Sequence, residues 1–154
     1  MTDFRSVFEA TAPQMIAAAW DYLERSEAVD LIWVYVSQDE GVYTCNSYFK
    51  VNGEILDHYE AAKRVGADSS HEAQRWLSGQ MDEPVARFRE ASTVSEVPNR
   101  MILQFRPADS DFHADFYYGS LWPGMPDDDR PSLSAVERDW FARLKTTGNA
   151  SAGV

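Results

Sequence analysis

The sequence has only one cysteine, Cys45, among its 154 residues, so a disulfide within the chain is excluded. It also lacks any apolar run that approaches the ~18 residues of a membrane-spanning helix. The first residues, Met1–Arg5, do not have the basic and then apolar pattern of a secretory signal peptide. A lone thiol and no export signal are typical of a cytoplasmic protein, so we expect that location and no membrane partner.

Positive charge is scarce as well. Lys and Arg together number 14, against 25 Asp and Glu, which gives a formal net charge of -11 at pH 7. Proteins that bind nucleic acid present basic surfaces to the phosphates, so no nucleic acid partner is expected. Strong acidity serves solubility alone, or it favours a basic protein partner, because opposite charges speed association.

The sequence motifs of the common catalytic and cofactor sites are absent. The chain contains no phosphate-binding loop, no glycine-rich dinucleotide motif, no HExxH motif and no paired CxxC motif. Its serines also lack the Gly-x-Ser-x-Gly context of a nucleophile. We therefore expect no enzymatic activity and no cofactor.

What remains is the composition of a folded globular protein, with 44% hydrophobic and 13% aromatic residues. Apolar residues recur with helical spacing in three segments. The first helix is predicted to begin at the capping box Thr11-Ala12-Pro13-Gln14, with residues 3–10 as a separate earlier turn. The other two are predicted to begin at serine caps, one at Ser69 and one at Ser132 or Ser134.

Alternating β-branched and aromatic residues predict two hairpins. The first joins residues 31–36 to residues 42–51, and Asn52-Gly53 then turns the chain into a short third strand. The second joins residues 101–106 to residues 111–118. Both hairpins are typical of antiparallel pairing.

The order α-β-β-(β)-α-β-β-α predicts a single α+β domain over residues 1–147. We expect an antiparallel sheet of four to five strands packed against about three helices. The polar residues 60–70 predict a loop, and residues 148–154 predict a flexible C-terminal tail.

Side chains alternate between the two faces of a strand, and one face of the first hairpin is unusually aromatic. That face carries Trp33, Tyr35 and Tyr48, and the matching face of the second hairpin carries Tyr117. We interpret it as an exposed surface that binds a partner, because aromatic residues anchor protein interfaces. The alternative is a further layer of helix that covers it.

Asp111, His113 and Asp115 alternate along one predicted strand, so they share a face at a spacing of ~7 Å. Two carboxylates around an imidazole could hold a divalent metal or orient a histidine base, as in a metal-assisted hydrolase. A single strand rarely completes a metal site, so a solvated charged face is the alternative reading, and we expect no metal.

Acidic residues gather at three turns, and none has the Asp-x-Asp-x-Asp-Gly spacing of a calcium loop. Carboxylates near aromatic anchors favour a protein-binding surface, since they steer and pair with Arg or Lys of a partner. The candidate partner-binding residues are Trp33, Tyr35, Asp39, Glu40, Tyr48, Asp109, Asp111, Asp115, Tyr117, Trp122, Asp127, Asp128 and Asp129.

Four segments carry a resemblance to a known family. They are the strand Ile32–Tyr35, the strand end Tyr48–Gly53, the hairpin Met101–Tyr118 and the run Arg138-Asp139-Trp140 of the last helix. In their order, over residues 12–145, they resemble the YezG-like immunity (antitoxin) proteins of bacterial polymorphic toxin systems. The resemblance implies a small cytoplasmic protein that binds and blocks a cognate toxin and has no catalysis of its own. It assigns no binding residues.

The sequence is therefore consistent with three alternative functions. The first is an immunity protein that occludes the active site of its toxin, for which a nuclease with a basic cleft is one fitting class. The second is the metal-assisted hydrolase of Asp111, His113 and Asp115. The third is a sensor or scaffold domain that forms a homodimer through its aromatic sheet face. The sequence leaves the choice between a monomer and a homodimer open.

Overall fold

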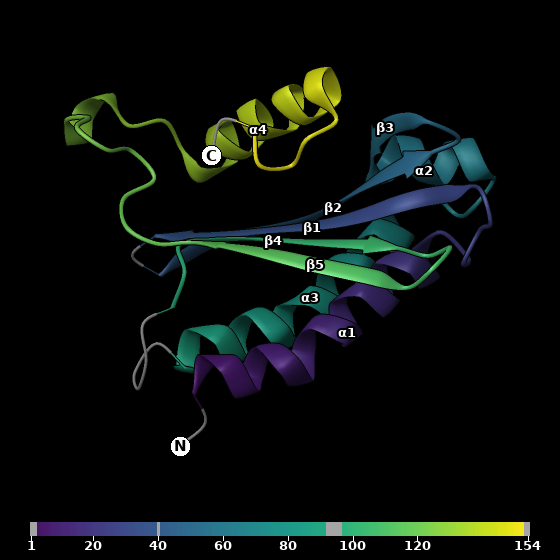
Figure 1. Ribbon diagram of the computed structural model, residues 1–154, viewed down its shortest axis with the longest axis horizontal. Helices are drawn as coiled ribbons and strands as arrows, with labels where there is room; N and C mark the ends of the chain where they lie inside the picture. The colour runs from purple at the N-terminus through teal and green to yellow at the C-terminus, as the bar shows by residue number, and fades with distance from the viewer. Residues whose placement is uncertain (1–2, 40, 92–96, 153–154) are drawn as a thin grey trace.

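A five-stranded antiparallel sheet carries helices on both of its faces (Figure 1). The computed structural model describes residues 3–39, 41–91 and 97–152. The elements are α1 (Phe4–Tyr22), β1 (Val29–Asp39), β2 (Val42–Val51), β3 (Glu54–Asp57), α2 (His58–Val65), α3 (His71–Ala91), β4 (Arg100–Arg106), β5 (Asp111–Tyr117), the 3-10 helix η1 (Asp127–Asp129) and α4 (Leu133–Thr147).

The strands lie in the order β3-β2-β1-β4-β5, which places the long strand β1 at the centre of the sheet. Ile32 in β1 lies opposite Phe49 in β2 and opposite Phe105 in β4. Both predicted hairpins and the short third strand are present, and the fold is the single α+β domain that the sequence predicts. Among the described helices, none has the length and hydropathy to cross a lipid bilayer.

The main core lies between the sheet and the layer of α1 and α3. The aliphatic face of β1 supplies Ile32 and Val34, and α1 supplies Met15 and Ala19, all of them buried. Alternation along the strands predicts this face correctly, because one buried face fixes the register of every neighbouring strand.

Helix α1 begins earlier than predicted and runs through Pro13 without ending. Its cap is Asp3, whose carboxylate accepts a hydrogen bond from the Ser6 backbone N–H at 2.9 Å. The predicted cap residue, Thr11, lies inside the helix and its hydroxyl donates to the Val7 carbonyl at 2.7 Å. Pro13 removes one helical hydrogen bond, and the packing of the flanking turns on the sheet compensates for that loss.

The predicted loop over residues 60–70 is wrong in its first part, because α2 occupies His58–Val65. The Asp57 carboxylate accepts from the Glu60 backbone N–H at 2.8 Å, and Gly66 ends the helix in the left-handed region at φ 76°. A helix of eight residues spans little more than two turns, which is too short for its apolar repeat to stand out in the sequence. Its two caps were the signal that could have found it.

Helix α4 covers the sheet face opposite to α1 and α3 (Figure 1). Trp140 and Leu144 of this helix are buried against the sheet. The residues after α4 turn back onto it, since the Trp140 indole N–H donates to the Ala150 carbonyl at 2.8 Å and Ala150 itself is buried. The described end of the chain thus packs on the domain, which differs from the expected free tail.

Candidate functional site

The aromatic face predicted to bind a partner lies beneath α4. Trp33 and Tyr35 are 0% exposed and Tyr48 is 7% exposed. The Trp140 ring of α4 lies 4.7 Å from the ring of Tyr35 and 5.3 Å from that of Tyr48, between centroids. The prediction of an exposed aromatic surface is therefore wrong, because the last helix supplies the covering layer. The face is equally closed to a second copy of the chain, so the homodimer predicted through it is wrong too.

A buried carboxylate lies among these aromatic rings. Glu137 of α4 accepts hydrogen bonds from the Asn46 amide at 2.7 Å and from the Tyr48 hydroxyl. Burial and the neighbouring Glu137 charge raise the pKa of Tyr48. Burial likewise raises the pKa of Tyr35. These groups attach α4 to the sheet and lie closed off from solvent, which indicates a structural role.

The Asp111, His113 and Asp115 row lies on the same sheet face as α4, because His113 is opposite Gln104, which is opposite Trp33. The His113 imidazole lies 3.0 Å from the Asp115 carboxylate, whereas Asp111 turns to Arg106 instead. Within residues 3–39, 41–91 and 97–152, no group of three His, Cys, Asp or Glu side chains is placed to hold a metal ion. The described residues thus provide no metal-binding cluster for the predicted hydrolase.

Two further candidate residues are less accessible than a binding anchor requires. Tyr117 is half-buried, packs against the core beneath α4 and lies 5.6 Å from the Arg100 guanidinium. Trp122 is buried to 9% exposure, and the Arg130 guanidinium lies 5.5 Å from its ring. Both side chains therefore have a structural role beneath the surface and offer little contact area to a partner.

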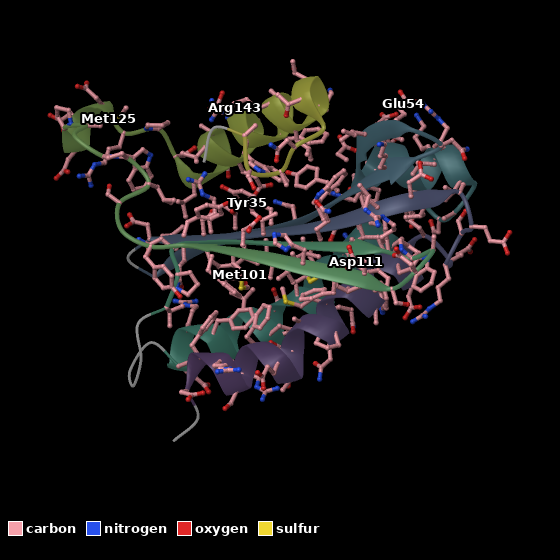
Figure 2. All side chains as sticks on the ribbon, in the orientation of Figure 1. Tyr35, Glu54, Met101, Asp111, Met125 and Arg143 are labelled. Carbon is pink, nitrogen blue, oxygen red and sulfur yellow. The ribbon has the colours of Figure 1, made fainter. Side chains whose placement is uncertain are left out.

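The structure separates the acidic candidates into two groups. Asp109 and Asp111 flank the β4–β5 turn, while Asp39 lies near the other end of the sheet, where Ser37 is opposite Arg100. Figure 2 shows Met125, which precedes Asp127–Asp129, at the far left of the molecule and Asp111 to the right of its centre. Glu40 lies outside the described residues. The twelve described candidates therefore do not form one continuous surface.

At the β4–β5 turn, the acidic charge is largely balanced. The Arg106 guanidinium lies 3.2 Å from the Asp109 carboxylate and 3.9 Å from that of Asp111. The Asp111 backbone N–H donates to Asp109 and lowers the pKa of that carboxyl. These contacts stabilise a tight turn and leave little free charge for a partner.

The segment of residues 118–130, here called the acidic connector, joins β5 to α4 and projects from the domain (Figure 1). Its 3-10 turn exposes three carboxylates in a row, those of Asp127, Asp128 and Asp129. Two apolar side chains of the connector are also exposed, Tyr118 at 52% and Met125 at 39%. The acidic connector is thus the part of the predicted site that keeps both charge and apolar surface available.

A groove that the sequence reasoning missed runs between α1 and the β4–β5 hairpin. It has a volume of about 450 Å³ and is largely apolar, with Phe8, Pro13, Ala17, Phe105 and Phe112 among its lining residues. Phe105 and Phe112 lie opposite each other on the face of the β4–β5 hairpin that meets α1. The arrangement leaves the outer part of that face uncovered, since α1 packs beneath β1 and β4 and no described helix lies beyond it. No periodicity in a single sequence reveals how far a helix layer extends under a sheet.

Comparison with models of known protein families finds none that matches this chain, and comparison with curated proteins finds no match either.

Proposed function

We propose that this protein is an immunity protein that binds a cognate toxin domain and blocks its active site, and that the acidic connector contacts the toxin. The observation that carries the proposal is the exposed run Asp127–Asp129. Among the described residues only Asp127 of the three forms an ion pair, with Arg130 at 3.1 Å. Asp128 and Asp129 are therefore available to a basic partner.

Charge supports this assignment beyond the loop itself. The whole chain carries a net charge of -11, so a basic toxin surface is attracted from a distance and association is fast at low salt. A catalytic cleft that binds phosphates, as in a nuclease, is basic for the same reason and suits three adjacent carboxylates. The exposed Met125 and Tyr118 add apolar contact, which gives a complex its slow dissociation.

The acidic connector is also anchored, which lowers the entropy lost when a partner binds. Arg130 donates to the Met125 carbonyl at 3.3 Å and lies over the buried ring of Trp122. Beyond it, Ser132 caps α4 and accepts from the Ala135 backbone N–H at 3.1 Å. The carboxylates are thus held on a supported turn next to the rigid α4 layer.

The test is a binding measurement with the product of the gene immediately upstream, at low and at high salt. We expect a tight complex that salt weakens, because screening reduces attraction between exposed charges. Changing Asp127, Asp128 and Asp129 to Asn should reduce the affinity by roughly tenfold or more, mainly through slower association.

A matched control changes three other exposed acids, with the substitutions Glu24→Gln, Glu60→Gln and Glu72→Gln, and alters the net charge equally. We expect this control to retain most of the affinity. An equal loss of affinity in both triple variants would show that net charge alone causes the effect. The acidic connector would then not be part of the interface. No binding by the wild-type protein at either salt concentration would contradict the immunity function itself.

A further inference from the structure

Strand β5 is one of the two edge strands of the sheet, and within the described part of the chain it pairs only with β4. One row of its backbone N–H and C=O groups therefore has no strand beside it. Natural edge strands are usually protected by charged side chains, above all lysine, by proline or by a bulge. The sequence of β5, Asp-Phe-His-Ala-Asp-Phe-Tyr, contains no lysine or proline, its two aspartates share one face of the strand with His113, and its pairing with β4 runs without a register shift.

The sequence of β5 is complementary to itself. We propose that β5 pairs antiparallel with β5 of a second copy of this chain, about a two-fold axis at Ala114. That register places His113 opposite the partner's Asp115 and Phe112 opposite the partner's Phe116. A hydrogen-bonded polar pair and paired aromatic residues across two strands both stabilise a sheet.

The neighbouring registers are less favourable. An axis at His113 would set Asp111 opposite the partner's Asp115, and an axis at Asp115 would set that residue opposite its own copy. Like charges directly opposite each other destabilise a strand pair. The axis at Ala114 also lies at the midpoint of β5, so all seven residues of the strand are paired.

The apolar groove next to β5 supports the same occupant. A two-fold axis perpendicular to the sheet keeps both copies of α1 on one side, so the groove of each copy, about 450 Å³ in volume, opens beside the partner's Phe116. Phe112 is 42% exposed in the single chain and lies beside Phe8, with ring centroids 6.2 Å apart. In the dimer Phe112 is covered by the partner's Phe116 and by the apolar residues around both grooves, which supplies hydrophobic stabilisation.

The acidic connector lies outside the contact between the two copies. The dimer can therefore be tested independently of toxin binding. The test is the mass of the full chain in solution, measured by sedimentation over a range of concentrations. We expect twice the chain mass of 17.5 kDa at high concentration.

The variant His113→Asp should weaken the dimer by roughly tenfold or more, because it puts two acids opposite each other in each of the two symmetric pairs. The control His71→Asp makes the same charge change at an exposed position of α3 and should leave the dimer intact. The exchange His113→Asp with Asp115→His keeps the composition and restores a histidine opposite each aspartate, so it should restore the dimer. Circular dichroism checks that each variant is folded.

A cysteine at position 114 gives a direct test of the axis. Under mild oxidation, Ala114→Cys should form a disulfide-linked dimer faster than Ala108→Cys in the β4–β5 turn, since only position 114 meets its own copy. The wild-type chain, with Cys45 alone, is the background. A monomer at every concentration would overturn the proposal. The free edge of β5 would then be open to pairing with a strand of another protein. A dimer that His113→Asp does not weaken and that Ala114→Cys does not cross-link would place the contact elsewhere and overturn it as well.

Discussion

The Glu137 carboxylate on α4 accepts a hydrogen bond from the Tyr48 hydroxyl on β2, and both side chains are buried. The same carboxylate oxygen accepts from Asn46 at 2.7 Å. A helix that covers an aromatic sheet face would otherwise be free to slide, because apolar contact is not directional. The buried carboxylate fixes the position of α4, and with it the end of the acidic connector.

Replacing Glu137 with Ala should therefore destabilise the fold. The change leaves the buried Tyr48 hydroxyl and the half-buried Asn46 amide without their acceptor, which costs about 1–3 kcal/mol of unfolding free energy. Urea denaturation measures it. Asp139→Ala, on the exposed side of the same helix, removes only the surface pair with Arg143 and should cost less than about 1 kcal/mol. Equal losses would mean that the Glu137 contacts contribute nothing specific.

The stability of the protein should fall at alkaline pH. Burial and the Glu137 charge raise the pKa of Tyr48 above its ordinary value of 10.0. A raised pKa means that the folded state keeps a proton that the unfolded state loses. Stability is thus fully present below pH ~10 and declines above it, by up to ~1.4 kcal/mol per pH unit for each such group. Denaturation midpoints between neutral and strongly alkaline pH measure the decline.

The variant Tyr48→Phe measures the share of that alkaline loss that Tyr48 carries. It removes one titrating hydroxyl and should lessen the pH dependence of stability, whose remainder comes from other groups with a raised pKa such as Tyr35, even though stability at neutral pH is lower. Tyr118→Phe, at an exposed tyrosine, should leave the dependence unchanged. A profile as steep in Tyr48→Phe as in the wild type would show that other groups cause the decline.

The start of α4 gives a sharp comparison between two serines. Ser132 caps the helix through the Ala135 backbone N–H, whereas Ser134 lies inside the first turn and is exposed. Ser132→Ala should cost about 1 kcal/mol of unfolding free energy. Ser134→Ala should be neutral or slightly stabilising, because Ala favours a helix interior. The sequence left both serines open as the cap, and thermal denaturation of the pair checks the structural answer.

Trp140 should be the largest single contributor to the core beneath α4. It is 1% exposed and contacts the rings of Tyr35 and Tyr48. Trp140→Ala should cost about 3–5 kcal/mol and remove the near-UV circular dichroism of this cluster. Trp76→Ala, at a tryptophan that is 45% exposed on α3, is the matched control and should cost far less. A small loss in Trp140→Ala would mean that α4 does not hold the domain together.

The sequence predicted which side chains share a face but not which face meets solvent. Alternation along β1 put Trp33 and Tyr35 together correctly. Whether that face is covered depends on where α4 packs, which is a tertiary choice that strand patterning does not contain. The two faces of β1 therefore looked like a core and a surface, while both are cores.

The acidic residues show the same limit. Their clustering at turns was readable, and the exposure of Asp127, Asp128 and Asp129 agrees with it. Arg106 pairs with Asp109 at the β4–β5 turn, and this turn lies at the end of the sheet away from Asp39. Both facts depend on the register between strands, which a local sequence pattern does not contain. The groove beside α1 depends on the width of the helix layer, which no local pattern sets.

The most direct test of the proposed immunity function is a titration of the product of the gene immediately upstream with the wild-type protein and with the Asp127→Asn, Asp128→Asn, Asp129→Asn variant, at low and at high salt. We expect a tight wild-type complex that salt weakens, and a variant that binds more weakly and depends less on salt. A variant with the affinity and salt dependence of the wild type, or a wild-type protein that binds no toxin at low salt, would contradict the proposal.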